Sequence, residues 1–216
     1  MRNVKALWLL ALLISTIFTG CSHQQPKAPL ISQNWADHKL KVEAVQNWQA
    51  NGKLAVKVPN DGGNLNLKWL QTGDAFQIDL NGPFGSGKVT IKGIPNSVTM
   101  IEAGQAPQTA KTAEELIRKN SGWTIPVSQL AFWVRGLPDP NTKVTRFTPN
   151  AQGLIGELEQ SGWKITYGDY LSLTTATNIL PMPGRIVAEY KDVRLTLAVR
   201  EWLAINPGQT PAQAAQ

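Results

Sequence analysis

Apolar and polar residues alternate along much of the chain, and this alternation limits the possible fold more than any other feature. In the first half, apolar side chains recur at every second position in the segments 54–58, 65–69, 76–80, 89–91 and 97–101. Successive side chains of a β-strand point to opposite faces, so each segment predicts a half-buried strand with one apolar face.

The alternation returns in the second half, in the segments 154–158, 163–167, 171–173, 186–190 and 193–199. We therefore predict a mainly β fold with α: an unclosed, half-open antiparallel β-barrel of about 11 strands. Covering such a sheet with helices protects its edges and its apolar face. The space between sheet and helices need not fill with side chains, so it can form a hydrophobic ligand cavity.

Three segments, 34–48, 112–120 and 126–137, carry helical patterns. The first places apolar residues at roughly helical spacing as far as Trp48. A capping box opens the second at Thr112, and a proline, which is favoured in a first helical turn, opens the third. The apolar stripe of the third segment consists of Leu130, Trp133, Val134 and Leu137.

The side chains that most enzymes use for catalysis are scarce. Cys21 is the only cysteine, and the only histidines are His23 and His38. A Ser-His-Asp triad, a Cys-His pair or a clustered-histidine zinc site needs groups that this chain lacks. We expect His38 to lie on the surface, and we predict that the chain is not an enzyme and has no catalytic residues, no metal site and no cofactor.

The first residues have the pattern of a bacterial lipoprotein signal. Arg2 and Lys5 precede an apolar run over 6–17, and two small residues then lead to Cys21. This order describes a secretory signal peptide, and the run is short for a membrane span. The cysteine resembles the lipobox position at which the thiol takes up diacylglycerol, although Phe18 stands where leucine is usual. The alternative is an ordinary signal peptide followed by an incidental cysteine.

Four regions follow from these patterns. Residues 1–20 are the signal peptide that is removed, 21–33 form a lipidated N-terminus and flexible tether, 34–205 form a single open-barrel domain, and 206–216 are a disordered tail. A hydrophobic content of 42% suits a folded domain. The formal charge of +6 is spread along the chain, which argues against binding to nucleic acid because no basic stripe forms.

The segment 81–87 departs from the alternation. It reads Asn-Gly-Pro-Phe-Gly-Ser-Gly, so Pro83 and Gly85 enclose the large apolar Phe84 among residues that favour turns. Loops of this kind run over the surface. From the residues alone, Phe84 either folds back onto the core or is displayed to a lipid or an apolar partner.

Several motifs, taken in this order, resemble the LolB family of outer-membrane lipoprotein receptors over residues 1–203. The motifs are 81–86 (NGPFGS), 132–138 (FWVRGLP), 162–168 (GWKITYG), 181–183 (PMP) and 201–202 (EW).

The resemblance implies an unclosed barrel whose helices form a lid over a hydrophobic cavity. It also implies a function, which is to accept acylated lipoproteins from the periplasmic carrier LolA and to release them into the outer membrane. The protein would be a monomer, lipid-anchored to the outer membrane and facing the periplasm. In that family a protruding loop presents an apolar residue, usually leucine, that is needed for membrane delivery, and Phe84 occupies the matching position here.

The inward faces of the sheet and the third helix supply the residues that we expect to line the acyl cavity; the alternative is that they only pack the core. These candidates are Leu54, Val56, Leu67, Trp69, Ile78, Leu80, Ile91, Leu130, Trp133 and Leu137.

Two other functions remain open. A structural outer-membrane lipoprotein could scaffold a partner without carrying acylated cargo, and it would have a filled core. A periplasmic carrier resembling LolA could share the curved sheet, but the lipobox argues against it because a shuttle must stay soluble.

Overall fold

The computed structural model describes residues 34–205, which form a strongly curved antiparallel sheet covered by short helices. The strands are β1 (Asn47–Val58), β2 (Asp61–Thr72), β3 (Ala75–Asn81), β4 (Val89–Ile94), β5 (Ser97–Glu102), β6 (Gln108–Ala110), β7 (Val144–Pro149), β8 (Ile155–Gln160), β9 (Trp163–Gly168), β10 (Leu171–Thr174), β11 (Ile179–Met182), β12 (Arg185–Tyr190) and β13 (Val193–Ala204). The helices are α2 (Trp35–Glu43), the 3₁₀ turn η1 (Pro83–Gly85), α3 (Ala113–Ser121) and α4 (Val127–Trp133). The expected signal peptide, the lipid site at Cys21, the tether and the tail lie outside the described residues.

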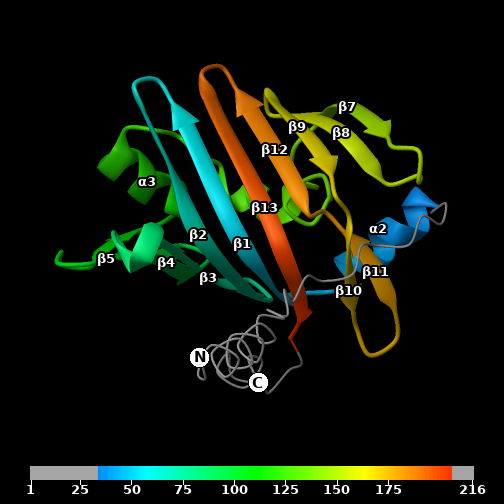
Figure 1. Ribbon diagram of the computed structural model, residues 1–216, viewed down its shortest axis with the longest axis horizontal. Helices are drawn as coiled ribbons and strands as arrows, with labels where there is room; N and C mark the ends of the chain where they lie inside the picture. Colours follow the sequence, from blue (N-terminus) through cyan, green and yellow to red (C-terminus); the bar gives the residue numbers. More distant parts are fainter. Residues whose placement is uncertain (1–33, 206–216) are drawn as a thin grey trace, which may run out of the picture.

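Eleven strands form one sheet in the order β6-β5-β4-β3-β2-β1-β13-β12-β9-β8-β7. The long strands β2, β1 and β13 cross the middle of the molecule, with β5 and β7 toward opposite ends (Figure 1). Because β6 and β7 are the two edges and do not pair, the barrel stays open. The predicted open antiparallel barrel with helices is therefore confirmed, while β10 and β11 form a separate two-stranded sheet.

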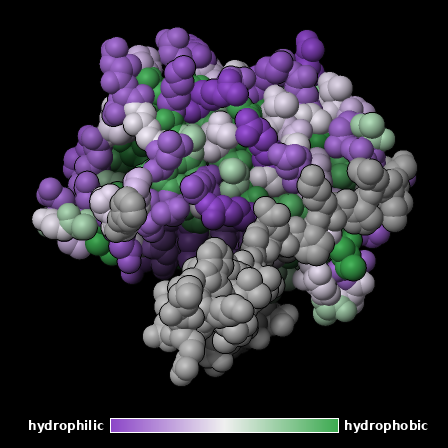
Figure 2. Space-filling view, viewed as in Figure 1, coloured by the Kyte–Doolittle hydropathy of each residue, from purple (hydrophilic) through white to green (hydrophobic). Residues whose placement is uncertain are grey.

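The apolar side chains of neighbouring strands form continuous rows across one face of the sheet. Leu54 of β1 lies between Leu65 of β2 and Leu197 of β13, and Ile78 of β3 lies between Trp69 of β2 and Ile91 of β4. The sheet is mostly hydrophilic on the surface seen in Figure 2. The alternation in the sequence thus corresponds to one apolar face and one polar face.

A β-bulge changes which side chains of β13 face inward. Between β1 and β13 the register shifts at Asn51 and Gly52, so that Arg200 has no partner in the register. Before the bulge the odd-numbered residues of β13 are buried, and after it Trp202 is buried instead. A bulge inserts one extra residue into a strand, which explains why simple alternation does not predict an inward-facing Trp202.

The expected capping box begins α3 in part. The Thr112 hydroxyl accepts a hydrogen bond from the Glu115 amide at 3.2 Å. The Glu115 carboxylate, however, accepts from the amide of Lys111 and not from that of Thr112. The helix ends at Gly122, whose φ of +76° suits glycine.

The buried side-chain amide of Gln160 holds α4 and the loop after it against β8. The side-chain oxygen of Gln160 accepts hydrogen bonds from the Trp133 indole at 2.8 Å and from the Asp139 amide at 3.0 Å. Its nitrogen donates to the carbonyls of Asp139 and Thr142. All four groups would lose a partner if this amide were removed, so the position of α4 depends on Gln160.

Two expectations for the first helical segment are wrong. The helix α2 ends at Glu43, and Trp48 lies in β1, where it is 1% exposed. The start of β1 was not recognised as a strand because Ala50 and Gly52 stand where the alternation would place large apolar side chains. His38 is not a surface residue, since it is only 4% exposed and packs near Trp35.

The burial of His38 predicts a pH-dependent stability. Burial, followed by the nearby charge of Lys41, lowers its pKa from 6.5 to about 4. Between these two values the unfolded chain takes up a proton that the folded chain does not, so the free energy of unfolding should fall as the pH falls. The loss should reach about 3 kcal/mol, measured by urea denaturation from pH 7 to pH 4. His38→Gln should reduce this slope, and an equal slope in both proteins would contradict the assignment.

Candidate functional site

The concave face of the sheet is not filled by the helices that cover it. Two open cavities lie between the strands and α3 and α4, with volumes of about 620 Å³ and about 800 Å³. Trp69 and Val127 line both cavities, so the two adjoin each other. We call the first the apolar cavity and the second the polar cavity, after the side chains that surround them.

The apolar cavity lies over β1 to β5 and β13, under α3 and α4. Its sheet side is formed mainly by the apolar rows described above, with Asp61 and Glu102 also in the lining. Ile117, Trp123 and Leu130 cover it from the helical side. Leu54, Val56 and Leu80 belong to the apolar face of the sheet but remain half-buried. These side chains therefore border empty space, as in sites for apolar ligands.

Most of the candidates chosen from the sequence meet at this cavity. Eight of them line it, and Trp133 and Leu137 do not. Those two are fully buried, and the Trp133 indole is bonded to Gln160. The eight are Leu54, Val56, Leu67, Trp69, Ile78, Leu80, Ile91 and Leu130.

Several lining residues were not among the candidates. Leu65, Val89, Leu195 and Leu197 belong to the same alternating segments and could have been selected by the same rule. Ile117 lies in α3, and no pattern in the sequence indicates which part of the sheet that helix covers.

The loop between β3 and β4 reaches the rim of the apolar cavity at Gly87. Its turn η1 is closed by local hydrogen bonds, including those from the Gly85 amide to the Gly82 carbonyl and from the Ser86 hydroxyl to the Pro83 carbonyl. Pro83 and Gly85 are exposed. Phe84 is the middle residue of this turn, and its side chain lies outside what the structure describes.

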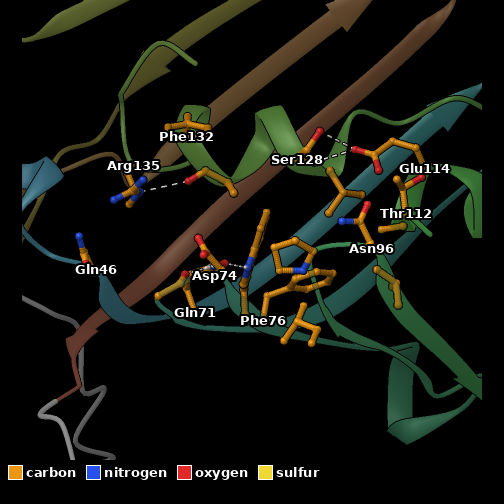
Figure 3. Close-up of a pocket in the computed structure, with 18 of the residues that line it drawn as sticks. Gln46, Gln71, Asp74, Phe76, Asn96, Thr112, Glu114, Ser128, Phe132 and Arg135 are labelled. Carbon is orange, nitrogen blue, oxygen red and sulfur yellow. Dashed lines mark hydrogen bonds between the residues drawn. The ribbon is translucent and has the colours of Figure 1, made fainter. Parts of the chain in front are cut away.

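The polar cavity has aromatic walls and a polar rim. Trp48, Trp69 and Phe76 supply the aromatic rings, with the indoles of Trp48 and Trp69 5.6 Å apart. Figure 3 shows the polar side chains of the lining: Arg135 and Gln46 lie toward one end, Gln71 and Asp74 lie next to Phe76, and Asn96, Thr112, Glu114 and Ser128 lie toward the other end.

Arg135 is held in this rim by backbone and aromatic groups. Its Nε donates to the Ala131 carbonyl at 3.1 Å and its Nη1 to the Val45 carbonyl at 3.3 Å. The guanidinium carbon lies 5.8 Å from the ring centre of Trp48 and 5.6 Å from that of Phe132. Burial lowers the Arg135 pKa from 12.5 to about 10, partly offset by Glu43, so the group stays charged at neutral pH.

Neither a metal centre nor a membrane-spanning helix is found in the part of the chain that the structure describes. Residues 34–205 contain no cluster of three or more histidine, cysteine, aspartate or glutamate side chains suited to a metal ion. No helix within the same range has the length and hydropathy needed to cross a bilayer.

Comparison with known proteins gives consistent matches along the chain. The family model described as "Outer membrane lipoprotein LolB" matches residues 46–202. An outer-membrane lipoprotein LolB from Cellvibrio japonicus is 44% identical over 198 residues, covering 92% of this chain and 97% of the relative. Another from Stutzerimonas stutzeri is 33% identical, covering 90% and 94%. Among solved structures, a LolA superfamily protein from Nitrosomonas europaea has a TM-score of 0.48 at 8% identity, covering 86% of this chain and 99% of that one.

Filling the apolar cavity should remove its capacity for apolar ligands. Leu65→Trp adds bulk at a half-buried lining position. We expect it to weaken the binding of an environment-sensitive apolar dye about 10-fold or more, because the dye and the indole would occupy the same space. Leu40→Trp is the matched control, since Leu40 is 66% exposed on α2 and does not line the cavity. Equal dye titrations for the two variants would show that the dye binds elsewhere.

Proposed function

Because this chain belongs to the LolB family of outer-membrane lipoproteins, we propose that it accepts acylated lipoproteins from a LolA-like periplasmic carrier and releases them into the outer membrane. It is an outer-membrane, lipid-anchored protein that acts in lipoprotein localisation, and it is not an enzyme. The lipid anchor is assigned to Cys21, the only cysteine of the chain.

The observation that carries the proposal is the apolar cavity under α3 and α4. Transfer of an acyl chain from water to an apolar site is favourable by about 0.8 kcal/mol for each methylene group. A long chain therefore cannot cross the periplasm unshielded. A cavity lined by leucine, isoleucine, valine and tryptophan shields such a chain without a covalent step. The eight candidates that line it, together with Leu65, are assigned to acyl contact.

Transfer in one direction needs only that the affinity for the acyl chains increases from one holder to the next. The carrier must hold the acyl chains less tightly than this receptor does, and the bilayer must hold them more tightly still. No nucleotide or cofactor is then required, because each step lowers the free energy of the cargo.

The loop over 81–87 is assigned to membrane delivery through Phe84. Its position supports this role, since the loop begins at the end of β3 and reaches the rim of the apolar cavity at Gly87. An apolar side chain that enters the outer part of the bilayer there would bring the acyl chains within reach of the lipid.

The scaffold alternative is less well supported than the receptor. A lipoprotein that only anchors a partner would gain stability from a filled core. Half-buried apolar side chains around about 620 Å³ of open space instead favour a protein that binds an apolar ligand.

The direct test of the receptor function is the transfer of cargo between purified proteins. The mature chain with Cys21→Ala, which carries no lipid of its own, is mixed with a carrier loaded with an acylated lipoprotein. At equal concentrations most of the cargo should move to this chain, measured by gel filtration or affinity pull-down. If the cargo stays on the carrier at equilibrium, the receptor function is wrong.

The role of the loop is tested by changing Phe84 alone. Phe84→Glu should accept cargo as the wild type does, but it should deliver that cargo to liposomes about 10-fold more slowly, because a carboxylate is costly to insert into lipid. Phe84→Leu, which introduces the residue usual in the family, is the control and should deliver at close to the wild-type rate. Delivery by Phe84→Glu at the rate of the control would remove the loop from the mechanism.

A further inference from the structure

The polar cavity brings together a buried hydrogen-bond donor that has no partner among the described residues and a half-buried arginine. The Trp48 indole N–H is buried and has no acceptor among residues 34–205. Arg135 uses Nε and Nη1 on backbone carbonyls, and no carboxylate within the described range lies within 4 Å of its guanidinium group. Buried donors normally have partners, so the Trp48 N–H is open to an acceptor from outside the protein. Arg135 adds a charged donor beside it that has no carboxylate partner among residues 34–205.

The two donors occupy the same part of the cavity. The guanidinium carbon of Arg135 lies 5.8 Å from the centre of the Trp48 ring, and both residues line the polar cavity. Trp48 is fixed by its packing against Trp69 and Trp202, at ring distances of 5.6 Å and 5.4 Å. Aromatic packing therefore positions one donor, and two hydrogen bonds to backbone carbonyls position the other.

The charges around the cavity favour a neutral acceptor over an anion. Arg135 and Lys111 supply two positive charges to the lining, while Glu43, Asp74 and Glu114 supply three negative ones. Glu114 is itself engaged, since it accepts hydrogen bonds from the amide and the hydroxyl of Ser128, both at 2.7 Å. A carbonyl oxygen satisfies a donor without adding a further negative charge to this lining.

The polar cavity also adjoins the apolar cavity. Trp69 and Val127 line both, so a ligand with acyl chains in the apolar cavity can place the group that joins those chains beside Trp48 and Arg135. An acylated lipoprotein has a suitable group at this point, because its diacylglyceryl moiety carries two ester carbonyls where the chains begin. The aromatic walls suit the glyceryl carbons, and the polar rim suits the peptide that follows them.

We propose that the polar cavity binds the ester carbonyls of the cargo's diacylglyceryl group through Arg135 and the Trp48 indole, while the acyl chains lie in the apolar cavity. The proposal rests on the receptor function above and adds an orientation to it. The linkage group lies toward α2 and the start of α3, and the chain ends lie toward the loop that carries Phe84. Chains released at the loop would then enter the bilayer before the polar group leaves the protein.

The test compares two synthetic lipopeptides that differ only in their ester carbonyls. One is a triacylated cysteinyl tetrapeptide, and the other is its analogue in which ether links replace both glyceryl esters. Their dissociation constants are measured by fluorescence titration with the mature chain carrying Cys21→Ala. The wild-type binding site should prefer the ester about 10-fold or more, the effect of a hydrogen bond to a charged donor.

Variants of the two donors should change this preference specifically. Arg135→Met and Trp48→Phe should each lower the ratio of ester to ether affinity toward one, and Arg135→Lys should restore part of it. Trp163→Phe is the matched control, since Trp163 is a buried tryptophan of β9 that lines neither cavity and does not pack against Trp48. It should leave the ratio at the wild-type value.

The outcomes separate this proposal from the receptor function. If the wild type binds ester and ether equally, the carbonyl site is wrong and the receptor function stands. If it binds neither lipopeptide, the receptor function fails and the carbonyl site fails with it. A wild-type preference that survives in both Arg135→Met and Trp48→Phe would assign the preference to other residues and overturn the site.

Discussion

The structure depends on one constraint. An eleven-stranded antiparallel sheet has a continuous apolar face that must be shielded from water, although the sheet does not close into a barrel. The edges β6 and β7 stay apart, and the helices α3 and α4 are only nine and seven residues long. Such short helices cover the concave face but cannot fill it, so leucine and valine side chains remain half-buried around open space. The buried Gln160 amide holds α4 in place over this space, through its bonds to Trp133 and to the backbone after the helix. The cavity is thus a consequence of the architecture.

Function follows from how the concave face is divided. One end presents mainly apolar side chains. The other places an arginine, and an indole N–H that has no partner among residues 34–205, beside aromatic rings. An acylated cargo has the same division between hydrocarbon chains and a carbonyl-bearing linkage. On our proposals, the lipid anchor keeps the receptor at the membrane, the cavity shields the chains, and the loop at 81–87 offers them to the bilayer.

Much of this architecture could be predicted from the sequence, because strict alternation leaves few other folds. The same alternation identified seven residues of the apolar cavity, from Leu54 to Ile91, and the helical stripe added Leu130. It failed where the chain departs from regular geometry: the bulge at Arg200 moves Trp202 to the inner face, and Ala50 and Gly52 disguise the start of β1. Trp133 shows a second limit of prediction from the sequence. The helical stripe predicts that a side chain is buried, but not whether it lines the cavity or, like Trp133, packs away from it and donates to Gln160. The polar cavity was not foreseen, because its residues come from distant segments that only the folded chain brings together.

The central claim is that acyl chains of the cargo lie in the apolar cavity, and photo-crosslinking tests it most directly. A lipoprotein whose acyl chains carry a diazirine near the chain end is loaded onto the receptor and illuminated, and the crosslinked residues are identified by mass spectrometry. We predict crosslinks to cavity-lining residues such as Leu65, Leu80 and Ile117, with a marked loss of crosslinking in Leu65→Trp. Crosslinks confined to exposed residues such as Leu40 and Ile179, and unchanged in that variant, would contradict the account.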